Sequence, residues 1–378
     1  MNFLKTINEV RRNAMFSVTK NIGNSFAILH TNLASRKEIN RILICRPNHR
    51  LGNLLLITPL VQDVIDTFPN CKIDLFVKGN LAPALFKNYE NINCIIELPR
   101  KPFMNLLQYI LGWILIQNTR YDLVINAVKN SSSGRLSAKF ANSANKIFGD
   151  VSRDLILESK EEYAHIAKCP VHTFRSYLTK LGIKINPKPV ASLNLKLSPF
   201  EISQGHQLLK TVAGDNDKKT ICLYTYATGD KCYSVSWWKK FYGRLKSEYP
   251  THNIIEVLPI ENVSNLTFKA PTFYSKDIRE IASLIANTAV FISADNGIMH
   301  LASAAQTPTI GLFSITDKNA YGPYNCNSTG IRVTSYEMNE CIKVLNTILK
   351  RENIHDEIGP IADEFESAFH DVKQYYAK

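Results

Sequence analysis

The sequence predicts an α/β protein made of two Rossmann-like, doubly wound domains that face a cleft. Short apolar runs, typical of buried strands, alternate with amphipathic stretches about 10–15 residues long, which implies parallel sheets flanked by helices. The alternation occurs twice and is interrupted at residues 185–200 by a polar stretch with closely spaced prolines. The length of 378 residues also suits two domains, since a domain usually holds about 100–200 residues.

The first half of the chain is expected to supply four strands and two long helices. The strand segments are RILICR (41–46), KIDLFVK (72–78), CIIEL (94–98) and YDLVINAV (121–128). The helical segments are LLLITPLVQDVIDTF (54–68), which Pro69 closes, and FMNLLQYILGWILI (103–116). The second of these is too short to span a membrane, so we expect a buried helix; contact with a membrane surface is the alternative.

The second half repeats the alternation of strands and helices. Its strand segments are TICLYTY (220–226), NIIEVLP (253–259), AVFISA (289–294) and TPTIGLF (307–313). Its helical segments are WWKKFYGRLKSEYP (237–250), DIREIASLIANT (277–288) and GIMHLASAAQ (297–306). We therefore expect one domain over residues 41–190 and another over 191–348.

The two ends of the chain are expected to be additions to these domains. Residues 1–40 carry six basic and two acidic residues, with apolar side chains at helical spacing from Phe3 to Val18. A basic amphipathic helix of this kind either lies on anionic lipid or packs on the first domain. Residues 349–378 are expected to form a helical tail.

The charge and cysteine content narrow the classes of function. A formal net charge of +12 favours polyanionic partners: phosphorylated small molecules, an anionic membrane face or nucleic acid. Basic residues are spread along the chain without a zinc spacing or an RNA-binding signature, so no nucleic-acid partner is expected. The eight cysteines form no CxxC pair, which with the absence of a signal peptide predicts free thiols in a cytoplasmic protein.

Ligands of open α/β sheets bind beyond the carboxyl ends of the strands, so the loops at those ends are the candidate site. The first loop, PNHRLGN (47–53), offers Gly52 for a tight turn, Asn53 as a helix cap and Arg50 as a charge beside a helix N-terminus. The second, YATGDK (226–231), contains Thr228 and Lys231 and suits a diphosphate.

The third loop is the most specific of the three. Asp295 and Asn296 end a strand, Gly297 begins a helix, and His300 follows one turn later. Backbone N–H groups at Asn296 and Gly297 would point at a phosphate. Other nucleotide folds find little support, because the chain has no GxGxxG after a strand and no GxxxxGK[ST].

These loops resemble those of glycosyltransferase family 9, the bacterial heptosyltransferases of lipopolysaccharide assembly. The family's C-terminal motif, roughly D-[ST]-G-x-x-H-L-A and then G-T-P-T, corresponds to Asp295–Ala302 and Gln306–Thr309. Its N-terminal pattern of a strand, L-G-D and an apolar helix with T-P corresponds to RILICRPNHRLGNLLLITPL (41–60). The resemblance covers most of residues 41–330, with the motifs in the same order.

The resemblance implies the GT-B architecture, with the acceptor bound by the first domain and the nucleotide-sugar by the second. It implies inverting transfer of a sugar, heptose being one candidate, from a nucleotide-diphospho-sugar to a glycan or glycolipid acceptor of lipopolysaccharide type. No metal or cofactor is expected beyond the donor, and the protein would work at the inner face of the membrane. Donor-binding residues would be Asp295, Asn296, Gly297, His300, Lys231 and Thr228; acceptor-binding residues would be Arg50, Gly52 and Lys129.

Two positions depart from the family pattern. The Asp of L-G-D, which the family uses as a base, is Asn53 here, and a carboxamide does not accept a proton near neutral pH. His49, four residues earlier, is the alternative base. The family Lys stands two residues before a Trp-Pro, whereas Lys231 stands six residues before Trp237.

Three functions therefore stay open at this point. The first is a sugar-nucleotide-dependent glycosyltransferase. The second is a non-catalytic protein that binds sugar-nucleotides or glycans with the same fold, which Asn53 favours. The third is an epimerase with a similar fold, which would need carboxylates that the first loop does not contain.

Overall fold

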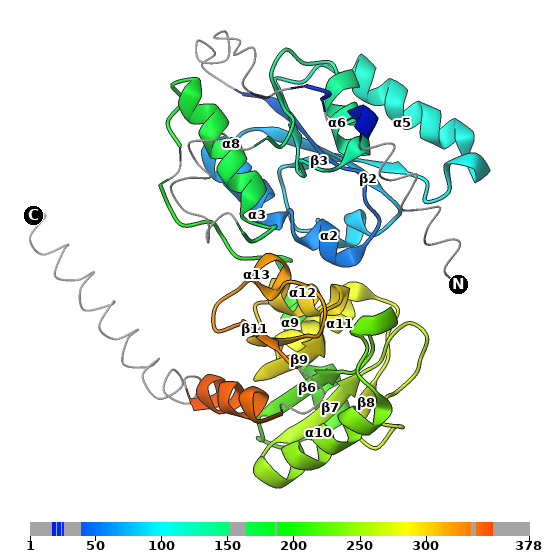
Figure 1. Ribbon diagram of the computed structural model, residues 1–378, viewed down its shortest axis with the longest axis vertical. Coiled ribbons are helices and arrows are strands. Elements are labelled where there is room, and N and C mark those ends of the chain that lie inside the picture. Colours follow the sequence, from blue (N-terminus) through cyan, green and yellow to red (C-terminus); the bar gives the residue numbers. More distant parts are fainter. Residues whose placement is uncertain are drawn as a thin grey trace, which may run out of the picture.

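The computed structural model describes residues 17–19, 21–23, 25, 39–150, 164–185, 187–333 and 338–350 (Figure 1). Most of the predicted appendage and nearly all of the predicted tail lie outside these residues, so the four predicted segment boundaries stay a prediction. Across the described part of the chain, no helix has the length and apolar character needed to cross a membrane. All eight cysteines are described and all are free thiols, as predicted.

Five parallel strands form the first sheet, in the order β3-β2-β1-β4-β5. The strands are β1 (Arg41–Arg46), β2 (Lys72–Lys78), β3 (Ile92–Leu98), β4 (Leu123–Asn126) and β5 (Lys146–Ile147). The helices are α2 (Leu51–Leu55), α3 (Thr58–Thr67), α4 (Ala82–Leu85), α5 (Leu106–Asn118), α6 (Ser132–Phe140) and α8 (Cys169–Lys180), with a 3-10 turn, η2 (Pro102–Met104). Strand β1 lies at the centre of the sheet. Its middle is an uninterrupted apolar run because helices cover both faces of the sheet: α3 and α8 pack on one face, and α5 and α6 pack on the other.

Six parallel strands form the second sheet, in the order β11-β10-β9-β6-β7-β8. The strands are β6 (Thr220–Tyr224), β7 (Asn253–Val257), β8 (Thr272–Phe273), β9 (Val290–Ala294), β10 (Thr309–Phe313) and β11 (Thr329–Arg332). The helices are α9 (Pro199–Ala213), α10 (Val235–Glu248), α11 (Ile278–Ala286), α12 (Gly297–Ala304) and α13 (Lys318–Tyr321), with a 3-10 turn, η3 (Gly229–Lys231). The predicted α/β architecture with two parallel sheets is thereby confirmed.

The structure differs from the predicted elements in several details. The single helix predicted after the first strand is two helices, because the chain turns at Leu56 and Pro59 occupies the first turn of α3. Asn53 does not cap that helix, since it lies inside α2 and Arg50 is the N-cap residue. Helix α9 was not predicted, although Ser198 and Glu201 form a capping box at its start.

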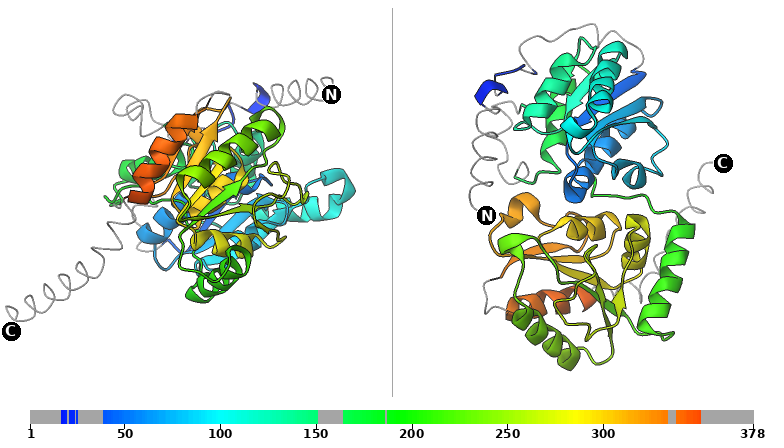
Figure 2. Two further views of the ribbon diagram at one scale, coloured as in Figure 1. Left: turned by 90° about the horizontal axis from the view of Figure 1, so that it is seen from below. Right: turned by 90° about the vertical axis from the view of Figure 1, so that its right-hand side faces the viewer.

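The helix predicted over 103–116 forms, as η2 and α5, but the prediction that it is buried is wrong. Within α5 only Gly112 and Ile116 are buried. The helix covers the first sheet with one side and leaves the other side in solvent; Figure 2 shows it projecting from the body of the first domain.

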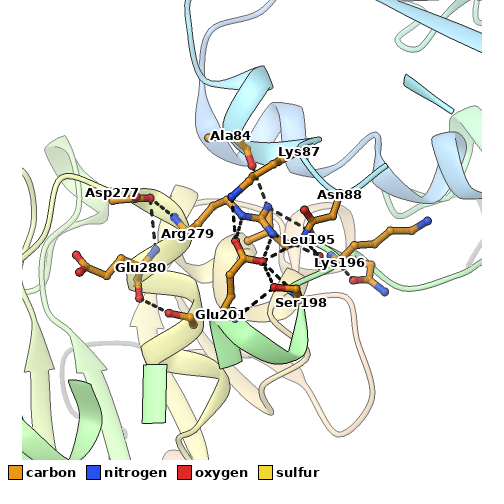
Figure 3. Close-up of polar contacts among 12 residues, drawn as sticks. Ala84, Lys87, Asn88, Leu195, Lys196, Ser198, Glu201, Asp277, Arg279 and Glu280 are labelled. Carbon is orange, nitrogen blue, oxygen red and sulfur yellow. Dashed lines mark hydrogen bonds and ion pairs between the residues drawn. The ribbon is translucent and has the colours of Figure 1, made fainter. Parts of the chain in front are cut away.

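A buried arginine joins the two domains on one side of their junction (Figure 3). Arg279, on α11, is 6% exposed and donates to the carboxylate of Glu201 on α9 at 2.5 and 2.8 Å. The same guanidinium donates to the carbonyl oxygens of Ala84 in the first domain and of Leu195 and Lys196 in the linker, at 2.9, 3.3 and 3.3 Å. These residues form what we call the Arg279 hub, which ties both domains and the linker together.

Candidate active site

The loops at the carboxyl ends of β1 and β9 meet where the two domains face each other, as Figure 1 shows for α2 and α12. A Cβ atom on Gly52 would lie 2.7 Å from Cδ2 of His300, and one on Gly297 would lie 3.1 Å from Cβ of Leu51. Gly52 therefore permits an approach of the two helices that a larger residue would force to change, and a Cβ on Gly297 would require its neighbour to give by a few tenths of an ångström. Two predicted site loops, far apart in sequence, are in direct contact.

Asn296 builds the start of α12 with its side chain. Its Oδ1 accepts hydrogen bonds from the backbone N–H groups of Ile298 and Met299, at 2.8 and 2.9 Å, as an N-cap residue does. Its Nδ2 donates to the carbonyl oxygens of Tyr226 and Ala294 at 3.1 and 2.8 Å. The amide thus fixes the loop after β6 to the loop after β9, and a phosphate at this helix would meet the N–H groups that precede Ile298.

Asp295 and Lys231 form an ion pair that joins the second and third predicted loops. Asp295 directly follows β9 and is buried, whereas about a third of the Lys231 side chain is exposed. The pair places Lys231 at the third loop despite its unusual distance from Trp237 in the sequence. A carboxylate and an ammonium group side by side offer an acceptor for sugar hydroxyls and a cation for a diphosphate.

His300, one turn into α12, is 4% exposed, and its Nδ1 has no hydrogen-bond partner among the residues that the structure describes. Burial lowers the pKa of His300 to about 4; the Asp295 carboxylate opposes this effect, and His165 and Lys231 add to it. The ring is therefore neutral at pH 7 and offers a polar atom rather than a positive charge. If His300 supports a phosphate, as we expect, the neutral ring does so by donating a hydrogen bond and not through a positive charge.

In the first domain, Asn53 is held by its neighbours instead of pointing freely outward. Its Nδ2 donates to Oδ1 of Asn48 at 3.1 Å, and the same oxygen accepts from the backbone N–H of Arg50 at 2.9 Å. The carbonyl oxygen of Asn53 accepts from Nε of Arg46 at 3.2 Å. The amide is therefore a fixed polar group in α2.

His49, the alternative base, is exposed and lies against Gly79, just beyond β2. Partial burial lowers its pKa, and the positive charges of Lys78, Arg100 and Arg50 lower it further. The imidazole is therefore unprotonated at neutral pH, which a base requires. The same three cations make this end of the first sheet strongly positive.

The remaining predicted residues lie around these groups. Thr228 starts η3 as its N-cap without a side-chain cap hydrogen bond and is exposed. Arg50 and Lys129, predicted to bind the acceptor, are exposed after β1 and β4. In the described ranges, no three His, Cys, Asp or Glu side chains gather as metal ligands would.

Two further residues lie at the junction of the domains and were not predicted from the sequence. Arg46 ends β1 and is 7% exposed, and burial lowers its pKa to about 10 while Tyr321 of the second domain raises it. The sequence pattern that could have indicated Arg46 is a charged residue at the end of an apolar strand. His165 contacts Gly322 through Nε2, 3.0 Å from the carbonyl oxygen, and its ring lies 4.9 Å from that of Tyr324. No sequence pattern singled it out.

Comparisons with known proteins agree with this geometry. A family model for glycosyltransferase family 9 (heptosyltransferase) matches residues 275–350. Lipopolysaccharide heptosyltransferase 3 of Escherichia coli is 24% identical over 306 residues, which cover 73% of this chain and 84% of that protein. Lipooligosaccharide heptosyltransferase 2 of Haemophilus influenzae is 25% identical over 329 residues, which cover 79% of this chain and 90% of that protein.

Solved structures show the same fold at lower identity. A glycosyl transferase family 9 protein from Veillonella parvula has a TM-score of 0.62 and 16% identity, over 84% of this chain and 99% of that one. The E. coli heptosyltransferase WaaC with ADP has a TM-score of 0.60 and 18% identity, over 82% of this chain and 99% of that one. The fold is therefore GT-B, and with the matched relatives it supports a glycosyltransferase. Within that class, the chain resembles the heptosyltransferases of family 9.

Proposed function

We propose that this chain transfers a sugar, heptose being the first candidate, from a nucleotide-diphospho-sugar to a glycan or glycolipid acceptor of lipopolysaccharide type. One observation carries the proposal: Asp295, Lys231 and His300 meet at the start of α12, the segment that the family model matches. The curated relatives are heptosyltransferases, and one solved structure of WaaC is described with ADP-2-deoxy-2-fluoro heptose. An adenosine-diphospho-heptose is therefore the first donor to test.

In the proposed reaction the acceptor hydroxyl oxygen bonds to the donor carbon from the face opposite the diphosphate, so the configuration inverts. The bond from that carbon to the diphosphate oxygen breaks, and the hydroxyl proton passes to a base, for which His49 is the candidate. Asp295 would accept hydrogen bonds from sugar hydroxyls, and Lys231 would bind the diphosphate as it leaves. Neutral His300 would donate a hydrogen bond through an N–H group. The fixed charge of Lys231 and the helix N-terminus would stabilise the departing phosphates without a metal or a cofactor.

On the acceptor side, the cations around His49 suit an anionic acceptor. Arg50, Lys78 and Arg100 all lower the pKa of this one imidazole, which places their charges near it. A phosphorylated or carboxylated glycan would be attracted to this end of the sheet. Transfer to a glycolipid would place the protein at the cytoplasmic face of a membrane, which stays a prediction.

The donor site is tested by replacing Asp295 with Asn. The variant keeps the shape of the side chain but loses the charge that pairs with Lys231, so we expect turnover to fall about 10²-fold or more, since charge-assisted contacts are the strong ones. Asp217→Asn, on an exposed loop before β6, is the matched control. Turnover and thermal shift with ADP-heptose are measured for both. Equal turnover in the two variants would remove Asp295 from the donor site.

A second candidate function, sugar-nucleotide binding without catalysis, is favoured by one observation, Asn53 in place of a carboxylate. If the chain is an enzyme and His49 is the base, His49→Ala should lower turnover about 10²–10⁴-fold while donor binding is retained. Asn53→Asp should raise turnover if the loop keeps the geometry of the family. Donor binding by the parent, without transfer to any acceptor in a panel of core oligosaccharides, would establish the non-catalytic function.

A further inference from the structure

The outer side of α5 and the turn before it form an apolar surface that no described part of the chain covers. Eight large apolar side chains there are between 42% and 96% exposed. We call this surface the α5 outer face; it consists of Phe103, Met104, Leu106, Leu107, Ile110, Leu111, Ile114 and Leu115. Neighbouring side chains on one short helix rarely expose this much apolar surface in a protein that meets only water.

The inner side of the same helix is apolar as well and already packed. The Trp113 ring meets Phe76 of β2 edge-on, with centroids 5.4 Å apart, and a Cβ on Gly112 would lie 2.7 Å from Leu98. Ile116 is fully buried. Helix α5 therefore has apolar residues on its outer side as well as its packed side, with Gln108, Gln117 and Asn118 as the exposed polar exceptions, whereas a helix at a water-exposed protein surface has a mainly polar outer side.

The segment that contains α5 is rich in basic residues. Between Leu98 and Gly149 the chain has one acidic residue, Asp122, and seven basic ones: Arg100, Lys101, Arg120, Lys129, Arg135, Lys139 and Lys146. The carboxylate of Asp122 accepts hydrogen bonds from the backbone N–H groups of Asn40 and Arg41. Arg135 is buried and paired with Asp150, and Glu97 at the end of β3 lies beside Gln108 of α5, so the positive charge near the helix comes from the exposed cations.

Three of these cations flank the helix itself. Lys101 precedes η2, Arg120 follows the end of α5, and Lys139 is next to Phe140, whose ring lies 6.2 Å from that of Trp113. All three are exposed. Apolar side chains framed by exposed cations match the layers of an anionic bilayer, with acyl chains beneath negatively charged headgroups.

We propose that the α5 outer face docks on the surface of an anionic lipid bilayer, with α5 lying in the interface and its flanking cations among the headgroups. A second copy of the chain fits this face less well, because pairing would bring two sets of positive charges together. The proposal does not depend on catalysis. Where the proposed function also holds, Arg100 links this surface to the acceptor loop, since its charge acts on His49.

The test is binding of the full chain to vesicles of phosphatidylcholine with and without phosphatidylglycerol, measured by co-sedimentation. The variant Leu107→Gln/Leu111→Gln/Ile114→Gln changes only exposed positions of α5, so its fold should persist, which circular dichroism checks. Ile260→Gln, at an exposed position of the second domain, is the matched control. We expect the parent and the control to bind the anionic vesicles and the triple variant to bind at least about tenfold more weakly.

A second variant separates the charges from the apolar contact. Lys101→Gln/Lys139→Gln should weaken binding to the anionic vesicles several-fold, and added salt should weaken the binding of the parent in the same way. Undiminished binding by the triple variant would overturn the proposal and assign lipid binding to another part of the chain, as would a parent that binds no anionic vesicle. Sedimentation velocity tests the alternative that a second copy of the chain binds the α5 outer face. A dimer of the parent that is lost in the triple variant would establish that alternative.

Discussion

The charge of the His300 ring follows from its position between the two domains. An unfolded chain would hold this imidazole at its ordinary pKa of about 6.5, whereas burial lowers it to about 4 in the folded protein. The unfolded state therefore takes up a proton first as the pH falls. The contribution to stability is complete above pH 6.5 and is lost between about pH 6.5 and 4.

We predict that His300→Gln loses less stability than the parent when the pH falls from about 7 to about 5. A group with these two pKa values accounts for about 2 kcal/mol over that interval, since one pKa unit is worth about 1.4 kcal/mol. Urea unfolding at both pH values measures the difference for each protein. The same pH dependence in both would show that His300 is not held neutral in the fold.

The sequence indicated some site residues better than others, and the reason is local. Asp295 and Asn296 stand at the end of an apolar strand, a pattern that places them at the sheet edge whatever the rest of the fold does. Arg46 and His165 act through neighbours more than 150 residues away in sequence, such as Gly322 and Tyr324, which no local pattern reveals. Asn53 was wrongly expected to cap a helix because α2 begins at Leu51, three residues earlier than predicted.

Two glycines within helices show how the surroundings determine the effect of an added methyl group on stability. Gly205, in α9, faces α11, and a Cβ there would lie 2.1 Å from the carbonyl oxygen of Ser283. Gly243, in α10, is exposed, and a Cβ there would meet nothing within 4 Å. The two positions share a helical backbone and differ only in their surroundings.

We predict opposite effects of alanine at these two positions. Gly205→Ala should destabilise the protein by about 1–3 kcal/mol or more, because α9 and α11 must move apart. Gly243→Ala should stabilise it by about 0.5–1 kcal/mol, because alanine favours the helix and nothing obstructs it. Chemical unfolding of both variants measures this, and a Gly205→Ala protein as stable as the parent would mean that the helices pack less closely than described.

The elements themselves were predictable where burial imposed a pattern. The central strands β1, β6, β9 and β10 are covered on both faces, so their apolar runs are unambiguous. Helix α5 forms near its predicted position, but sequence alone does not say which side of an apolar helix the rest of the protein covers. Helix α9 was missed because its polar residues, apart from the capping box, give no strong periodicity.

For the molecule as a whole, the Arg279 hub determines how firmly the domains are joined. Arg279 and Glu201 are both largely buried, and the hydrogen bond from Arg279 lowers the pKa of the Glu201 carboxyl below its usual range, as do further contacts. Removing one partner of a buried pair leaves the other charge in a poorly solvated place.

We predict that Glu201→Gln destabilises the protein by about 2–4 kcal/mol and loosens the contact between the domains. Lys210→Gln, which removes one member of the exposed pair with Asp215, is the control and should change stability by less than about 1 kcal/mol. Urea unfolding measures the stability, and small-angle scattering should show a larger radius of gyration for Glu201→Gln only. Identical curves for the two variants would mean that the hub does not hold the domains together.

The close approach of α2 and α12 also constrains how this chain can evolve. Gly52 leaves room for His300, and Gly297 leaves room for Leu51, so each domain fixes the size of a side chain in the other. A mutation that adds a side chain at position 52 requires the His300 ring or one of the two helices to shift. We therefore expect a chimaera that takes one domain from a related protein to keep this contact only where the two domains together supply a small residue at positions 52 and 297.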